Sequence, residues 1–247
     1  MTEPSAAADE RPAPILVTRV DVDRPLAPVS LARADGTRYT HALLIFYRGG
    51  VPVAQHSAPV TGDEITTEQL EAWVPALPAD RALPRPDDAP FISVVVPTVM
   101  QRGELLERSI GALAALDYPE FEVIVVDNRP DGTAERAVLH QRLGALPGVR
   151  VVSEAYPGIS AARNRGVRDA RGGIVAFTDD DAVTDPNWLW AFAARFAAEP
   201  ELACVTGPML PAELETAAQV WFESSGGKLA ADFRPVTYRR ASEPGGR

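Results

Sequence analysis

Residues 91–128, FISVVVPTVMQRGELLERSIGALAALDYPEFEVIVVDN, contain the pattern that decides the fold. Two largely apolar runs, at 91–97 and 121–127, flank a segment whose apolar residues recur at helical spacing. Strands that are apolar throughout are buried on both faces, and an intervening helix makes successive strands parallel. The stretch therefore predicts a strand–helix–strand unit of an open α/β sheet.

The same alternation continues toward the C-terminus, so the sheet is expected to have five strands and flanking helices. Helices are predicted at 103–116, 133–144, 160–171 and 187–200, and further strands at 149–154, 173–179 and 202–208. The fold class is thus α/β, with an open and mainly parallel sheet.

Four segments are predicted along the chain. Residues 1–14 are polar and rich in Pro and Ala, which is typical of a disordered tail. Residues 15–75 read as a small β-rich module of unknown role. Residues 76–90 are dense in Pro and charge and form the expected linker, so residues 91–247 make up a second, α/β domain.

Composition excludes several functions. The net charge of −10 argues against a nucleic-acid-binding protein, and three His in 247 residues are a poor supply for zinc or His-based triads. A single Cys fits a reducing compartment. The sequence shows no signal peptide and no apolar run long enough to predict a transmembrane segment. The expected location is cytoplasmic, either free or peripheral to the inner face of the membrane.

Polar residues follow the predicted strands at their carboxyl ends, where open α/β sheets bind ligands. The strongest group is Asp179-Asp180-Asp181, which follows a buried strand. Three adjacent carboxylates repel one another unless a cation neutralises them, and carboxylate oxygens suit Mg²⁺ or Mn²⁺. The alternative is a solvated acidic turn.

For two of three further residues, a functional role and a purely structural role are both open. Asp127, at a strand end and outside the core, accepts hydrogen bonds from a base or ribose, or else forms an Asx-turn. Arg163 faces a nucleotide, or else belongs to a basic helix face. His140 lies on a polar helix face and is expected to be solvated.

The segments SVVVPT, ELLERSIGAL, EVIVVDN and GISAARNRGVRDARGGIVAFTDDDAVTDPNWL, in this order, resemble the family 2 glycosyltransferases of the GT-A fold over roughly residues 91–208. The resemblance implies a GT-A-like fold, a nucleotide-sugar donor, Mn²⁺ or Mg²⁺, and an inverting displacement. The acceptor it leaves open is a saccharide, a lipid-linked molecule or a small molecule.

The resemblance also implies roles for the acidic triplet, which matches the DXD motif of the family. Asp181 is the implied metal ligand. Asp179 lies near the ribose or a metal-bound water and is a second implied metal residue. Asp180 belongs to the implied nucleotide-sugar site.

The remaining implied donor-site residues lie earlier in the chain. Pro97 and Thr98 match the first nucleotide-binding loop, Asp127 matches the aspartate that contacts the base, and Arg163 matches a position near the nucleotide. The sequence departs from the family at Asn128, where a second Asp is common, and at the loop VMQR after Thr98.

The catalytic base of the family lies in an acidic Glu-Asp segment well beyond the DXD motif. Residues 209–247 contain no Glu-Asp pair, and their acidic residues are Glu213, Glu215, Glu223 and Asp232. The expectation is that this chain lacks the acceptor-binding part and the base, turns over weakly, and self-associates through residues 220–222.

Two alternatives stay open: a catalytically inactive nucleotide-sugar-binding fragment, and another nucleotide-using α/β transferase. A nucleotidyltransferase would want a Gly-rich basic loop where PTVMQRGE stands. Dinucleotide oxidoreductases need G-x-G-x-x-G at that point, and serine hydrolases need G-x-S-x-G, which Gly158–Ala162 fails to match.

Overall fold

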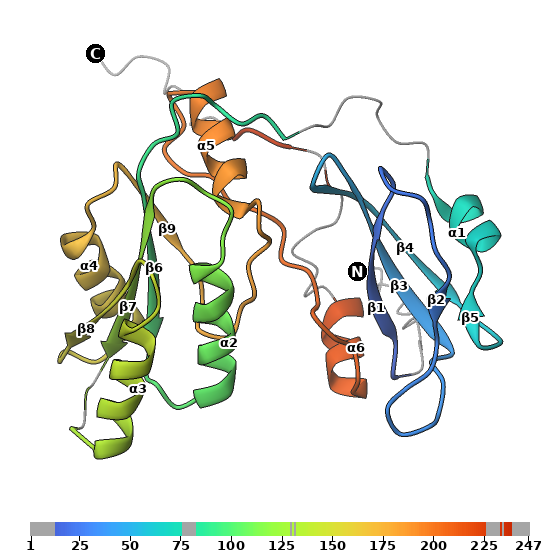
Figure 1. Ribbon diagram of the computed structural model, residues 1–247, viewed down its shortest axis with the longest axis horizontal. Coiled ribbons are helices and arrows are strands. Elements are labelled where there is room, and N and C mark those ends of the chain that lie inside the picture. The colour runs from blue at the N-terminus through green and yellow to red at the C-terminus, as the bar shows by residue number, and fades with distance from the viewer. Residues whose placement is uncertain are drawn as a thin grey trace, which may run out of the picture. The chain divides into compact units, whose positions relative to one another are not determined.

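Four parallel strands form the sheet at the centre of the unit Leu83–Val205 (Figure 1). Their order is β8-β7-β6-β9, and every neighbouring pair runs parallel. The bounds are β6 Ile92–Thr98, β7 Phe121–Asn128, β8 Val149–Glu154 and β9 Ile174–Phe177. This arrangement confirms the open parallel α/β sheet that the apolar runs predict.

The computed structural model describes residues 13–75, 83–128, 130, 132–225, 233 and 235–238. Residues 1–12 of the expected tail, residues 76–82 of the expected linker and Asp232 lie outside this part of the chain. The chain divides into two units: one is Leu83–Val205, and the other combines the residues before and after it.

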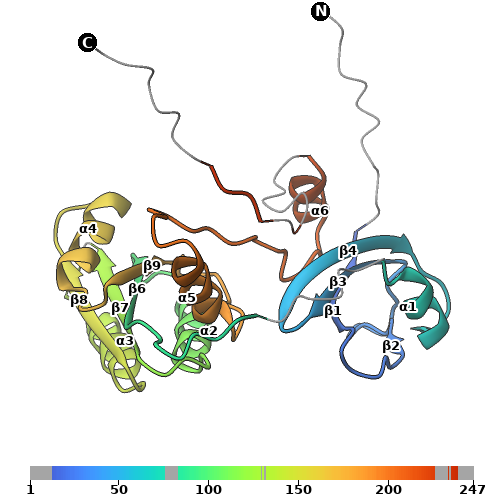
Figure 2. The ribbon, with the colours of Figure 1, turned by 90° about the horizontal axis from the view of Figure 1, so that it is seen from above.

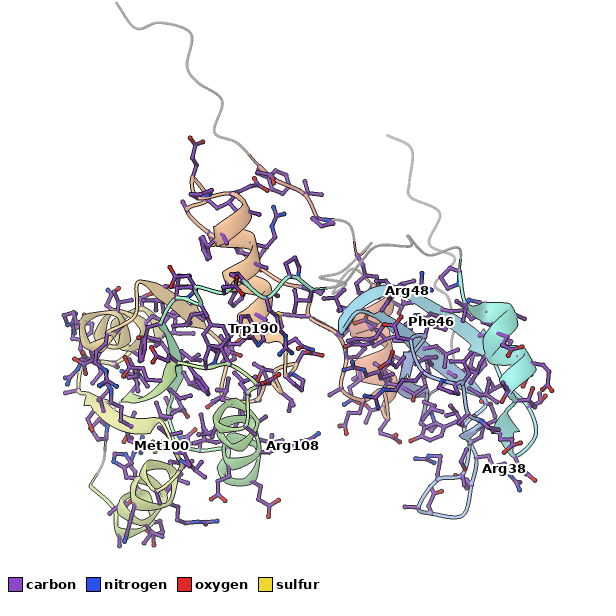
Figure 3. All side chains as sticks on the ribbon, turned by 45° about the horizontal axis from the view of Figure 1, so that its top comes forward. Arg38, Phe46, Arg48, Met100, Arg108 and Trp190 are labelled. Atoms are coloured by element: carbon purple, nitrogen blue, oxygen red, sulfur yellow. The ribbon has the colours of Figure 1, made fainter. Side chains whose placement is uncertain are left out.

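Helices cover both faces of the parallel sheet (Figure 2). Their bounds are α2 Gly103–Ala114, α3 Ala134–Gly144, α4 Ile159–Asp169 and α5 Trp188–Ala198. Alternate residues of each strand point to opposite faces, so Val94 and Val96 pack with α2 while Val95 packs with Ala162 of α4. Trp190 of α5 joins the α2 side of the core (Figure 3).

The fifth strand expected at residues 202–208 does not form. The segment is irregular, and Cys204 within it is exposed. Its apolar run ends at Gly207 and Pro208, and Pro cannot donate to a strand ladder. β-Propensity alone therefore does not create a strand here.

Gly166 allows α4 to approach the sheet closely. A Cβ at this position would collide with both methyl groups of Val95 on β6. We expect Gly166→Ala to destabilise this unit by about 1–3 kcal/mol, because overpacking forces side chains or backbone to shift. Gly111→Ala on α2 is the matched control, since nothing lies within 4 Å of its Cβ position. It is expected to stabilise by up to about 1 kcal/mol, and urea unfolding of both variants measures the difference.

The N-terminal unit contains a three-stranded sheet in the order β1-β3-β4 and a small β2-β5 ladder. The bounds are β1 Leu16–Asp21, β2 Val29–Ser30, β3 His41–Arg48, β4 Val51–Pro59 and β5 Glu64–Ile65. β3 and β4 are antiparallel across the Gly49-Gly50 turn, where both glycines have positive φ. The predicted β-rich character of this region is therefore confirmed.

Two helices cover the sheet of the N-terminal unit. α1 (Thr67–Trp73) begins with a capping box formed by Thr66 and Gln69, and its Leu70 packs in the cluster that contains Phe46 of β3 (Figure 3). α6 (Ala217–Ser224) places Val220 against Leu43, on the opposite side of β3.

The described residues from Thr206 onward belong to the N-terminal unit. Ile15 N–H donates to the Leu214 carbonyl at 2.8 Å, and Arg33 and Tyr39 donate to Glu215 at 2.9 and 2.5 Å. The expected domain at 91–247 includes Leu214, whereas the residue that Leu214 bonds to lies at position 15, in the N-terminal unit. The described residues contain no helix of the length and apolarity that a membrane crossing requires.

Candidate donor site

The polar residues singled out in the sequence gather at the carboxyl ends of β6, β7 and β9. Thr98 on β6 is in register with Asp127 on β7, and both are buried. Pro97 is buried in β6 and in register with Val126. The acidic triplet follows β9, the other neighbour of β6, two residues after the strand ends.

The three carboxylates of the triplet have different surroundings. Asp180 accepts a hydrogen bond from Thr98 Oγ1 at 2.7 Å, and its side chain is 15% exposed. Asp179 and Asp181 are 55% and 44% exposed. The middle residue therefore fastens the turn to β6, whereas the outer two present oxygens to solvent.

Two arginines neutralise the exposed carboxylates. Arg102, the N-cap residue of α2, pairs with Asp181 and lies 3.6 Å from Asp180. Arg163 on α4 has one Nη atom 3.5 Å from Asp179. The Nε of Arg163 is buried and has no hydrogen-bond partner among the described residues. A buried donor without a partner is costly, so this atom is suited to an acceptor from a ligand.

Asp127 is fully buried, which corrects the expectation that it lies outside the core. Arg136 on α3 binds both of its oxygens, through Nε at 2.8 Å and Nη2 at 2.5 Å. The Nε2 of His140 lies 2.7 Å from the same carboxylate, so the expectation of a solvated His140 is wrong. Arg136 also donates to the Val99 carbonyl at 2.9 Å and ties the loop after β6 to α3.

Arg136 was not among the candidate residues from sequence. The sequence feature that could have identified Arg136 is its spacing from His140. The two residues are four apart on the helix that follows the Asp127 strand, so both side chains lie on one helix face. Asn128 is the second residue without a predicted role. It is buried and its amide binds three backbone groups of the β8–α4 turn.

The donor set suits a hard divalent cation but is small. No group of three or more His, Cys, Asp and Glu side chains with metal-site geometry occurs in the described part of the chain. Asp179 and Asp181 offer accessible carboxylate oxygens. Mg²⁺ and related ions commonly use one or two carboxylates together with substrate phosphates, so two aspartates are sufficient protein ligands.

Several proteins with known roles are similar to parts of this chain. It is 35% identical over 104 residues to Glycosyltransferase AglE of Haloferax volcanii, which covers 40% of this chain and 33% of AglE. It is 29% identical over 131 residues to Glucosyl-dolichyl phosphate glucuronosyltransferase of the same organism, covering 49% of this chain and 38% of that protein. The chain thus spans about a third of the length of these relatives.

Solved structures include similar chains as well. The mannosyltransferase PcManGT from Pyrobaculum calidifontis, in complex with GDP-Man and Mn²⁺, has a TM-score of 0.43 and 28% identity, over 57% of this chain and 42% of that one. S. aureus TarS 1–349 in complex with UDP has a TM-score of 0.39 and 25% identity, over 49% of this chain and 38% of that one.

The sequence pattern of the family described as Glycosyl transferase family 2 matches residues 93–233. The match runs from the second residue of β6 through β9 and the acidic triplet, and it covers more than half of the 247-residue chain. This extent confirms the resemblance noted from the sequence motifs: the chain belongs to glycosyl transferase family 2.

Proposed function

We propose that the protein transfers a sugar from a nucleoside-diphosphate sugar to an acceptor hydroxyl, with inversion and with the help of a divalent cation. The observation that carries the proposal is the acidic turn after β9. The chain belongs to glycosyl transferase family 2. Its acidic turn holds the middle carboxylate, Asp180, to Thr98 and leaves the two outer carboxylates accessible. The reaction breaks the bond between the anomeric carbon and the diphosphate and forms one to the acceptor oxygen.

Asp181 and Asp179 are the residues that would hold Mn²⁺ or Mg²⁺. Such an ion, when bound, stabilises the negative charge that develops on the departing diphosphate. Arg102 pairs with Asp181, and Arg163 lies near Asp179. If these carboxylates held a cation, both guanidinium groups would be available to the phosphate oxygens of the donor.

The nucleoside part of the donor is assigned to the ends of β6 and β7. Thr98 and Asp180 form one fixed pair there, beside the buried Pro97. Asp127 is buried and its carboxylate is held by Arg136 and His140, so it would act on a nucleobase only through these two side chains. Arg163 supplies the buried Nε that lacks a partner among the described residues. Each of these roles in donor binding is proposed for the named residue of this chain.

The acceptor proton must pass to a base as the hydroxyl attacks. Glu215, one of the acidic residues considered for this role, binds Tyr39 and Arg33 in the N-terminal unit. The hydrogen bond from Tyr39, followed by that from Arg33, lowers the pKa of Glu215, which makes it a weaker base. Glu215 is therefore assigned a structural role, and the base is left unassigned.

Calorimetric titration tests the proposal directly. UDP, GDP, ADP and CDP are titrated with Mn²⁺ and again with a chelator, and one of them is expected to bind at least tenfold more tightly with the metal. Equal affinities for all four under both conditions would contradict the proposal. Release of the diphosphate from the matching nucleotide sugar in the presence of acceptors then separates a transferase from a protein that only binds the donor.

A further inference from the structure

Tyr156 is the most exposed aromatic residue among the described residues of the unit Leu83–Val205, with 73% of its surface accessible. It lies in the turn between β8 and α4, two residues after β8 ends. A large aromatic ring contributes its stabilisation by burial, so one that stands in water gives the fold little. Its exposure at a ligand-binding edge of the sheet therefore points to a partner outside the chain.

The backbone of this turn is fixed although the ring is exposed. Asn128 Nδ2 donates to the carbonyls of Tyr156 at 2.7 Å and Glu154 at 3.3 Å, and Gly158 N–H donates to Asn128 Oδ1 at 2.8 Å. The Tyr156 N–H donates to Glu154 Oε1 at 2.8 Å. A ring held on a fixed backbone loses little entropy when a ligand packs against it.

The turn adjoins the proposed nucleoside site. Asn128 is in register with Glu154, so the Tyr156 turn begins beside the end of β7, one residue beyond Asp127. The helix that the turn leads into, α4, carries Arg163 one turn further on. Tyr156 is thus on the same sheet edge as the groups assigned to the donor, and it adds an apolar face to a charged cluster.

We propose that Tyr156 is a binding residue of the donor site, whose ring stacks on the nucleobase, and that Asn128 is the positioning residue that presents it. This inference rests on the proposed function. Every nucleobase offers a flat π face, and stacking on an aromatic side chain strengthens binding without requiring a particular hydrogen-bonding pattern. Asn128 is required as an amide because it donates to carbonyls and accepts from an N–H at once.

The experiment compares a nucleoside diphosphate with pyrophosphate, which lacks the base. Tyr156→Ala is expected to weaken the nucleoside diphosphate that wild type prefers by roughly tenfold and to leave pyrophosphate binding unchanged. Tyr156→Phe keeps the stacking face and should keep wild-type affinity. Val138→Ala on α3 is the control, because it also truncates an exposed apolar residue of this unit.

Asn128→Asp tests the positioning role. An aspartate retains the acceptor for Gly158 but replaces two donated hydrogen bonds by repulsion between oxygens, so the base-dependent affinity should fall as in Tyr156→Ala. Equal nucleotide affinity in wild type and Tyr156→Ala, or an equal loss for pyrophosphate, overturns the stacking role. Wild-type affinity in Asn128→Asp overturns the positioning role. A wild-type protein that binds no nucleoside diphosphate contradicts the proposed function itself.

Discussion

Asp181→Asn is expected to abolish the metal-dependent gain in nucleotide affinity and to lower any transfer activity on the order of 100-fold or more. Asp181 is one of two accessible carboxylates in the turn after β9, and it pairs with Arg102. An amide keeps the shape of the side chain but loses the charge that a divalent cation needs. Titration of the nucleoside diphosphate with Mn²⁺ and with a chelator measures the effect.

Two further substitutions serve as controls for Asp181→Asn. Asp180→Asn keeps an acceptor oxygen for Thr98 Oγ1, so a smaller effect is expected than at Asp181. Asp117→Asn makes the same chemical change at an exposed residue that precedes β7, at the opposite edge of the sheet. It should leave binding unchanged. A metal-dependent gain that survives in Asp181→Asn would contradict the assignment of this residue.

The sheet and the position of the acidic turn are predictable from sequence because both depend on local pattern. The runs at 92–98 and 121–128 are largely apolar, and such runs become central strands wherever they are covered on both faces. A carboxylate directly after such a strand has to emerge at the carboxyl edge.

The surroundings of Asp127 could not be predicted in this way. Its burial depends on where α3 packs, which brings Arg136 and His140 onto its two oxygens. The packing of Leu214 against Ile15 is likewise a contact between residues far apart in the chain. Charged residues are seldom fully buried unless they are paired, so a lone Asp in a sequence is reasonably assigned to the surface.

Glu122 on β7 is expected to be the most important charged residue for the stability of the unit Leu83–Val205. Its carboxylate is buried and accepts hydrogen bonds from Ser93 Oγ at 2.8 Å, Arg150 Nε at 2.8 Å and the Arg171 N–H at 3.0 Å. Burial raises the pKa of Glu122, but these hydrogen bonds lower it more, from 4.5 to about 2. The network joins β6, β7 and β8 to the residues that precede β9.

The shift in pKa determines how stability depends on pH. Because the folded pKa of Glu122 lies below the unfolded one, its contribution is fully present above about pH 4.5 and is lost as the pH falls toward 2. A difference of this size corresponds to about 3 kcal/mol. We therefore expect Glu122→Gln to lower the free energy of unfolding at pH 7 by about that amount and to flatten the acid limb of the curve.

Hydrogen exchange of the β6 and β7 amides measures the opening of this unit separately from the N-terminal unit. Glu120→Gln is the control, because Glu120 is exposed and lies two residues before Glu122, and a surface change of this kind usually stays within about 0.5 kcal/mol. If the β6 and β7 amides are equally protected from exchange in Glu122→Gln and in Glu120→Gln at pH 7, the network does not stabilise the sheet. If they differ at pH 7 and converge toward pH 2, the stabilisation comes from the charge of Glu122 and not from its shape.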